Sequence, residues 1–337
     1  MGCAIDTDPA LARRAFADVR DGLPFDPALL AGWLAAATSA REPTTEALLA
    51  RLAESPDDHA AYAVLADHLH ALGDPRGELI ALELAIAGGA PAHALDDRRR
   101  ALQRELGMPG AESGSPVTAT WGIGYYRRVA VSSDTALAPI WRHPDMRLLR
   151  ELQVYFGNRY TDAQVDRVVR NLPRTIRVVD LRRPRPLSLA VTLAAALPRL
   201  EVLAVRGPFD IAGLAHRRLR CVELADQTVG ADLADAMAAL APAALPRLDT
   251  VVARTNGSLD RACMELADRG VVAQLVSLEL HDGAISAIGA DALARGLGDR
   301  RLGRLDIAGV TRTPDVVRRL AGLCRILYGA DDVPHGA

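Results

Sequence analysis

A short aliphatic pattern, L-x-x-L-x-L, recurs seven times from residue 149 onward, and it constrains the fold more than any other feature. The copies begin at Leu149, Ile176, Leu200, Leu219, Leu248, Leu275 and Leu302, and a weaker copy begins at Tyr126. Successive copies start about 19 to 29 residues apart. A period of this length is typical of a solenoid, in which each repeat buries its apolar face against the next repeat.

Each repeat has room for one strand and, in most cases, one helix. Aliphatic residues at every second position predict a strand with one buried face. Helical spacing follows over 162–172, 187–197 and 231–240. The tripeptide Leu-Pro-Arg precedes three of the strands, and its proline ends a helix and favours extended backbone. The interval before Leu219 is too short for a helix, so we expect a loop over 208–218.

One strand and one helix at this period resemble the unit of leucine-rich repeat proteins, and the long repeats are similar to the ribonuclease-inhibitor-like class. The resemblance covers residues 120–330. It implies an α/β fold: a leucine-rich repeat solenoid with a parallel strand face and helices outside. The chain departs from the family where an asparagine is expected eight residues after the first leucine, since only Asn256 fits clearly. We therefore expect an irregular, shallow arc.

A helical region precedes the repeats. Its segment 48–84 contains Pro56-Asp57-Asp58 and Gly73-Asp74-Pro75-Arg76-Gly77-Glu78, and it resembles the bacterial repeat-companion domain. That family has no established biochemical role, so the resemblance implies architecture alone. Residues 121–126 are expected to form the first strand. We divide the chain into N-terminal helices at 1–41, a small all-α repeat-companion module at 42–107, a linker at 108–117 and the repeat domain at 118–337.

The densest polar group of the helical region is Asp67, Asp74, Arg76 and Glu78. We interpret it as a structural turn, in which Asp74 caps the helix that Pro75 opens and Asp67 pairs with Arg76 across the hairpin. The alternative is a hydrolytic enzyme that uses the Asp67, Asp74 and Glu78 carboxylates. A catalytic site would also need a nucleophile or general base within hydrogen-bond reach, and the sequence offers none. We therefore predict no catalytic residues.

The outward-facing strand positions are the better functional signal. Side chains between the core leucines face the concave surface of a solenoid, which such proteins use for recognition. The candidate partner-binding residues are Tyr155, Phe156, Asp180, Arg182, Arg206, Glu223, Arg254, Glu279 and Asp306. Acidic and basic rows lie side by side, so these charges either neutralise one another or form a specific protein-binding surface. Tyr155 and Phe156 are the expected apolar anchors at one end.

The sequence features described above are compatible with three functions. We expect a non-enzymatic protein–protein interaction module, an adaptor, sensor or inhibitor in a bacterial multi-protein system, with a protein partner on the concave face. The hydrolase is one alternative. Nucleic-acid binding by the arginine-bearing repeat face is the other, and its affinity would fall steeply with salt.

Composition and net charge argue against several further classes of protein. The net charge of −2 argues against a dedicated nucleic-acid coat protein. The four cysteines are far apart, which favours free thiols and predicts no metal. The sequence also predicts no cofactor, no secretion signal and no membrane segment, and hence a cytoplasmic protein. Residues 1–107 hold 10 arginines against 17 carboxylates. Either these acidic helices dock on the basic repeats, or each part meets a partner of opposite charge.

Overall fold

A computed structural model describes residues 44–106, 117–132, 143–157, 160–183, 187–188, 190–226 and 233–329. The helices expected at 1–41 lie outside these ranges, and so does the linker at 108–117 apart from Val117. The chain divides into two units, Met1–Leu48 and Leu49–Ala337. The sheet and most of the described helices belong to the second unit.

Four helices precede the sheet: α3 (Thr45–Glu54), α4 (His59–Ala71), α5 (Pro75–Ala87) and α6 (Ala92–Glu105). Asp58 caps α4 by accepting a hydrogen bond of 2.9 Å from the backbone N–H of Ala61. Asp74 caps α5 by accepting one of 2.9 Å from the N–H of Arg76. Gly77 lets α4 and α5 approach closely, because a Cβ there would lie 2.6 Å from the backbone nitrogen of His70.

An open ten-stranded sheet follows the helices. Its strands, in spatial order, are β1 (Val117–Trp121), β2 (Tyr126–Val131), β3 (Glu151–Tyr155), β4 (Val178–Arg182), β6 (Val202–Arg206), β8 (Cys221–Asp226), β9 (Thr250–Thr255), β10 (Ser277–His281), β11 (Leu302–Asp306) and β12 (Cys324–Tyr328). All neighbours pair in parallel except β1 and β2, which are antiparallel. The two-residue strands β5 (Leu187–Ser188) and β7 (Phe209–Asp210) form a separate parallel pair.

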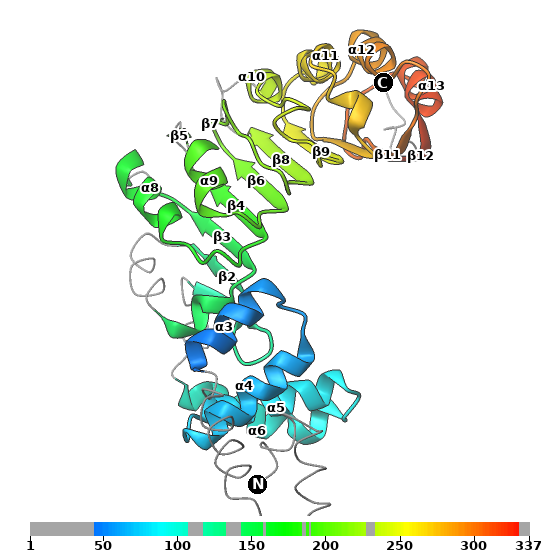
Figure 1. Cartoon of the computed structure of the whole chain (residues 1–337). Helices are drawn as coiled ribbons and strands as arrows, with labels where there is room; N and C mark the ends of the chain where they lie inside the picture. The colour runs from blue at the N-terminus through cyan, green and yellow to red at the C-terminus, as the bar shows by residue number, and fades with distance from the viewer. Residues whose placement is uncertain are drawn as a thin grey trace, which may run out of the picture. The chain divides into compact units, whose positions relative to one another are not determined.

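Helices alternate with the strands and cover one side of the sheet. They are α8 (Asp162–Arg170), α9 (Ala190–Ala196), α10 (Leu233–Ala238), α11 (Asp260–Asp268), α12 (Ala287–Leu297) and α13 (Pro314–Gly322), with short 3-10 turns η3 (Pro144–Leu148) and η4 (Val272–Gln274). Figure 1 shows these α-helices in a row along the outer side of the bent sheet. The arrangement is a solenoid-like α/β fold. None of the helices in the described ranges is long and apolar enough to span a membrane.

The structure confirms the expected parallel strands and corrects three details. Residues 122–125 form the turn between β1 and β2 and not a strand, because Gly122 and Tyr125 close a backbone hydrogen bond of 2.8 Å. The helix expected over 187–197 begins only at Ala190, after the short strand β5. The last strand, β12, was not expected, because it lacks the full aliphatic pattern. The segment 208–218, expected as a loop, contains no helix, but the two-residue strand β7 lies within it.

The core consists of aliphatic side chains in register across the strands. Val179, Leu203, Val222, Val251 and Leu278 are each paired with the next across neighbouring strands, and none of the five is exposed. Each side chain therefore packs between two others from adjacent repeats. This row continues into β11 through the pairing of Leu278 with Leu305.

We predict that Leu278→Ala lowers the free energy of unfolding by roughly 2–5 kcal/mol, because it leaves a cavity between two repeats. The matched control is Val276→Ala, since the Val276 side chain is 57% exposed only two residues away. That change should cost less than about 1 kcal/mol. Chemical denaturation of both variants measures the difference, and equal losses would contradict the placement of Leu278 in the core.

Candidate functional site

Five charged residues of the concave surface form a continuous chain of ion pairs, here called the central ladder. Asp180 pairs with Arg182 at 3.0 Å and with Arg206 at 3.4 Å. Arg206 also pairs with Glu223 at 2.9 Å, and Glu223 pairs with Arg254 at 3.3 Å. The residues belong to β4, β6, β8 and β9, so the ladder crosses four adjacent strands. Parallel register places these side chains within reach of one another.

A second charged group continues the same face on β10, β11 and β12. Arg304 pairs with Asp306 at 2.9 Å and with Glu279 at 3.7 Å, and its guanidinium lies 4.7 Å from the ring centre of Tyr328. Burial raises the pKa of Asp306, but hydrogen bonds from the Ala308 N–H and from Arg304 outweigh it, so the pKa lies below its usual value. His281 lies 3.5 Å from Glu279. These contacts therefore favour the charged form of the Asp306 carboxylate.

Most of the residues predicted for the binding surface lie together on the strand face, but Phe156 does not. Tyr155 is 42% exposed at the end of β3, as a binding anchor requires. Phe156 is fully buried and packs edge-on against Tyr160, with ring centres 5.6 Å apart. The expectation that Phe156 is an exposed anchor is therefore wrong. Successive residues at a strand end point to opposite faces, so Tyr155 and Phe156 do not share a surface.

The polar turn of the helical region is organised around Arg76, with a partner that the sequence did not indicate. The Arg76 guanidinium contacts Asp74 at 3.2 Å and Asp145 of η3 at 2.6 Å, and it lies 5.4 Å from the ring centre of Tyr125. Asp67 is exposed and forms no described contact with Arg76, so the expected Asp67–Arg76 pair is wrong. The turn thus connects α5 to the segment that precedes β3.

The carboxylates of the hydrolase alternative have separate surroundings. Asp74 caps α5 and faces Arg76. Glu78 forms a two-point contact with Arg98 of α6, with one distance of 2.6 Å, and its pKa is lowered by that contact. Asp67 lies exposed on α4. All three are accounted for by capping, pairing or solvent, which is the structural interpretation of the turn.

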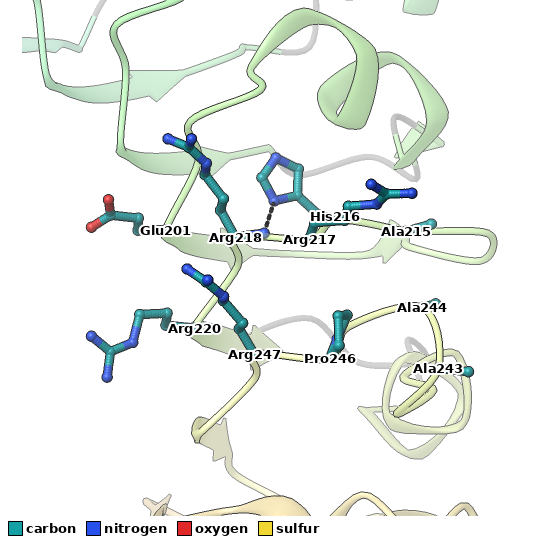
Figure 2. A pocket seen from close by; sticks show the side chains of 10 residues that line it. All are labelled: Glu201, Ala215, His216, Arg217, Arg218, Arg220, Ala243, Ala244, Pro246 and Arg247. Carbon is teal, nitrogen blue, oxygen red and sulfur yellow. Dashed lines mark hydrogen bonds between the residues drawn. The ribbon is translucent and has the colours of Figure 1, made fainter. Parts of the chain in front are cut away.

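The structure also contains a cavity that sequence reasoning did not identify, here called the edge pocket. It lies where the loops before β8 and β9 meet, and its volume is about 920 Å³. Four arginines line it, together with one carboxylate: Arg217, Arg218, Arg220, Arg247 and Glu201. In Figure 2, Arg218, Arg220 and Arg247 extend toward the side on which Glu201 lies, whereas Arg217 extends the other way. The pocket is therefore strongly cationic on one side.

His216 fixes the backbone of this pocket. It is nearly buried, and its Nε2 lies 2.9 Å from the carbonyl oxygen of Leu197. Its Nδ1 accepts a hydrogen bond of 3.2 Å from the backbone N–H of Arg218, as Figure 2 shows. The backbone N–H of His216 donates to the Ala244 carbonyl at 2.9 Å. The ring thus contacts Leu197 and Arg218, and the main chain of the same residue contacts Ala244, so His216 links three segments of the pocket wall.

Two sequence signals mark the edge pocket in retrospect. The Leu-Pro-Arg tripeptide at 245–247 places Arg247 three residues before β9, and the run at 216–220 supplies one histidine and three arginines. Neither signal shows that the two loops lie side by side. That proximity depends on the pairing of β8 with β9.

Comparisons with known proteins add little to this geometry. No protein-family model matches the chain, and no curated protein is similar to it. A crystal structure of a Bacteroides fragilis protein, determined by a structural genomics consortium, is similar with a TM-score of 0.39. The identity is 11%, and the match covers 61% of this chain and 74% of the other.

We predict that Arg76→Met strongly destabilises the protein, by roughly 3–5 kcal/mol, because the fully buried Asp145 carboxylate loses its guanidinium and keeps only the His143 imidazole at 3.2 Å. Arg98→Met is the matched control, since the Arg98–Glu78 pair is exposed and should contribute less than about 1 kcal/mol. Denaturant unfolding of the two variants provides the measurement. A loss for Arg76→Met no larger than for the control would show that the Arg76–Asp145 pair is not structural.

A half-buried carboxylate on α5, Glu83, predicts a pH dependence of stability. Glu83 accepts a hydrogen bond of 2.9 Å from the N–H of Gly124, in the turn between β1 and β2. Burial raises its pKa from 4.5 to about 7, although Gly124 and Arg99 oppose the shift. Between these two values the folded protein keeps a proton on Glu83 that the unfolded chain has released. Glu83 therefore makes the folded state less stable as the pH rises from 4.5 through 7.

We expect Glu83→Gln to remove this contribution, because glutamine does not titrate. Relative to the variant, the wild-type protein should lose about 2–3 kcal/mol of stability between pH 4.5 and 7.5. Glu105→Gln, at an exposed position of α6, should keep the wild-type pH profile. Denaturant titrations at several pH values measure these profiles. Parallel profiles for wild type and Glu83→Gln would contradict the prediction.

Proposed function

We propose that this chain is a leucine-rich repeat protein that binds a protein partner through its concave strand surface and has no catalytic activity of its own. The helices α3 to α6 would form its repeat-companion module. In this proposal the protein acts as an adaptor, sensor or inhibitor within a bacterial multi-protein assembly. The central ladder is the observation that carries the proposal.

The ladder supports binding because its charges are already held in place. Each of its arginines has a carboxylate within 3.4 Å, and strand pairing fixes the spacing between them. A partner that meets this surface orders few additional side chains, so little conformational entropy opposes association. Fixed charges of alternating sign also discriminate between partners, because a mismatched charge loses solvation without gaining a partner.

The exposed fractions of the ladder side chains indicate which charge the surface of a partner should carry. The arginine side chains of the ladder are 29–39% exposed, whereas its two carboxylates are 16–19% exposed. The guanidiniums therefore form most of the accessible polar surface, and Tyr155 adds an apolar anchor near one end. These features favour a partner patch that is acidic and partly apolar. Because each arginine is already paired with a carboxylate, the ladder is less suited to the phosphate backbone of a nucleic acid.

The test removes the ladder charges without leaving any of them unpaired. A five-site variant carries Asp180→Asn, Arg182→Gln, Arg206→Gln, Glu223→Gln and Arg254→Gln. The matched control carries Asp235→Asn and Arg261→Gln, which neutralise an exposed pair between α10 and α11. Affinity capture from the native cell identifies proteins that bind the wild type and the control, and titration calorimetry then measures their affinity.

We expect the five-site variant to bind such a partner at least tenfold more weakly while it remains folded by circular dichroism, since charged anchors contribute about 1–3 kcal/mol each. Tyr155→Ala should weaken the same complex. Undiminished binding by the folded five-site variant would exclude the concave surface. Retention of a nucleic acid, lost in the five-site variant and at high salt, would instead favour the nucleic-acid alternative.

A further inference from the structure

The edge pocket has cationic groups that the described part of the chain does not neutralise. Arg220 is paired with Asp249 at 2.6 Å. Glu201 lies 3.9 Å from Arg177, outside the pocket. Within the described ranges, Arg218 and Arg247 form no ion pair with a carboxylate, and both side chains are exposed. Two guanidiniums from adjacent loops thus line one cavity, and neither is ion-paired with Glu201, its one lining carboxylate.

The surroundings of Arg218 show that cations are crowded there. Arg199 donates a hydrogen bond to the carbonyl oxygen of Ala53, and it is partly buried. Burial lowers the pKa of Arg199, and the guanidiniums of Arg218 and Arg177 lower it further. Because Arg218 and Arg199 repel each other, an anion bound to Arg218 reduces this repulsion as well as accepting hydrogen bonds.

The side chains that line the pocket indicate which class of anion it can bind. A phosphate monoester carries close to two negative charges at neutral pH and several acceptor oxygens, which match two guanidinium forks from different loops. A single carboxylate carries one negative charge and would neutralise only one of the two guanidiniums. The pocket wall also contains Ala243, Ala244 and Pro246, against which an organic group attached to the phosphate can pack.

Two features argue against an extended polyanion. Carboxylates interrupt the cationic cluster, since Glu201 lines the pocket and Asp249 pairs with Arg220. The lining contains no Phe, Tyr or Trp on which a base could stack, and its one imidazole, His216, is nearly buried, whereas single-stranded nucleic-acid sites offer exposed rings. We infer that the edge pocket binds a phosphate monoester, held by the guanidiniums of Arg218 and Arg247.

The site is independent of the proposed concave surface. It lies at the ends where the strands begin, and it shares no residue with the central ladder. The backbone that supports it is fixed by His216, whose hydrogen bond from Arg218 uses the main-chain N–H. Substitution of the Arg218 side chain therefore leaves that hydrogen bond in place. Failure of one proposal does not imply failure of the other.

The test uses a pocket variant that carries both Arg218→Gln and Arg247→Gln. The control variant carries both Arg269→Gln and Arg300→Gln, at exposed positions outside the pocket, and its net charge changes by the same amount. Four probes are titrated calorimetrically against the full chain at matched ionic strength: inorganic phosphate, phenyl phosphate, a phosphoserine peptide and the same peptide with glutamate. A single-stranded oligonucleotide is the fifth probe. Melting temperatures confirm that all proteins are folded.

We expect the wild type and the control to bind phenyl phosphate or the phosphoserine peptide, and the pocket variant to bind at least tenfold more weakly, because charge-assisted hydrogen bonds are lost. Preference for phenyl phosphate would indicate a small phosphorylated metabolite, and preference for the peptide a phosphorylated protein. The proposal is overturned if no phosphate probe binds the wild type, or if both variants lose affinity equally. Tighter binding of the oligonucleotide through the same arginines would also overturn it, since the site would then serve a polyanion.

Discussion

The structure depends on burial of one aliphatic row that crosses the strands from repeat to repeat. Val222, Val251 and Leu278 belong to this row, and each is fully buried between neighbours from adjacent repeats. No single repeat can bury such a residue alone, because a strand and a helix leave its flanks open. The stability of every repeat is therefore shared with the repeats beside it. The regular register of the polar face is a consequence of the same packing, since a slip by one residue would turn the row toward solvent.

The charged side chains of the concave surface follow from that register. Parallel pairing places Asp180, Arg206 and Glu223 near one another on successive strands. Their contacts of 2.9–3.4 Å are partly shielded from water, so they are less screened than pairs on the helices. The net stability gained from such pairs is small. Their main effect is to hold the charge pattern of the surface in a fixed order, which is the property that recognition requires.

The helical region is joined to the sheet by a few buried polar contacts. Arg76 on α5 reaches the buried Asp145, and Glu83 on the same helix binds the turn that begins at Gly122. These contacts give a structural role to Asp74 and Arg76, two of the charged residues in the motif Gly73–Glu78. They also place two titratable groups in low-dielectric surroundings, where burial raises the pKa of both Asp145 and Glu83.

The sequence by itself determined the period of the repeat, the start of each central strand and the alternation of buried and exposed residues, because these depend on local spacing along the chain. It also indicated the cap of α5, in which Asp74 accepts a hydrogen bond from the N–H two residues further on. Only the tertiary structure decided which distant residues meet. Asp145 lies 69 positions from its partner Arg76, and Arg218 and Arg247 share a pocket through the pairing of β8 and β9. Contacts of that kind depend on the register and twist of the whole sheet, which no local pattern records.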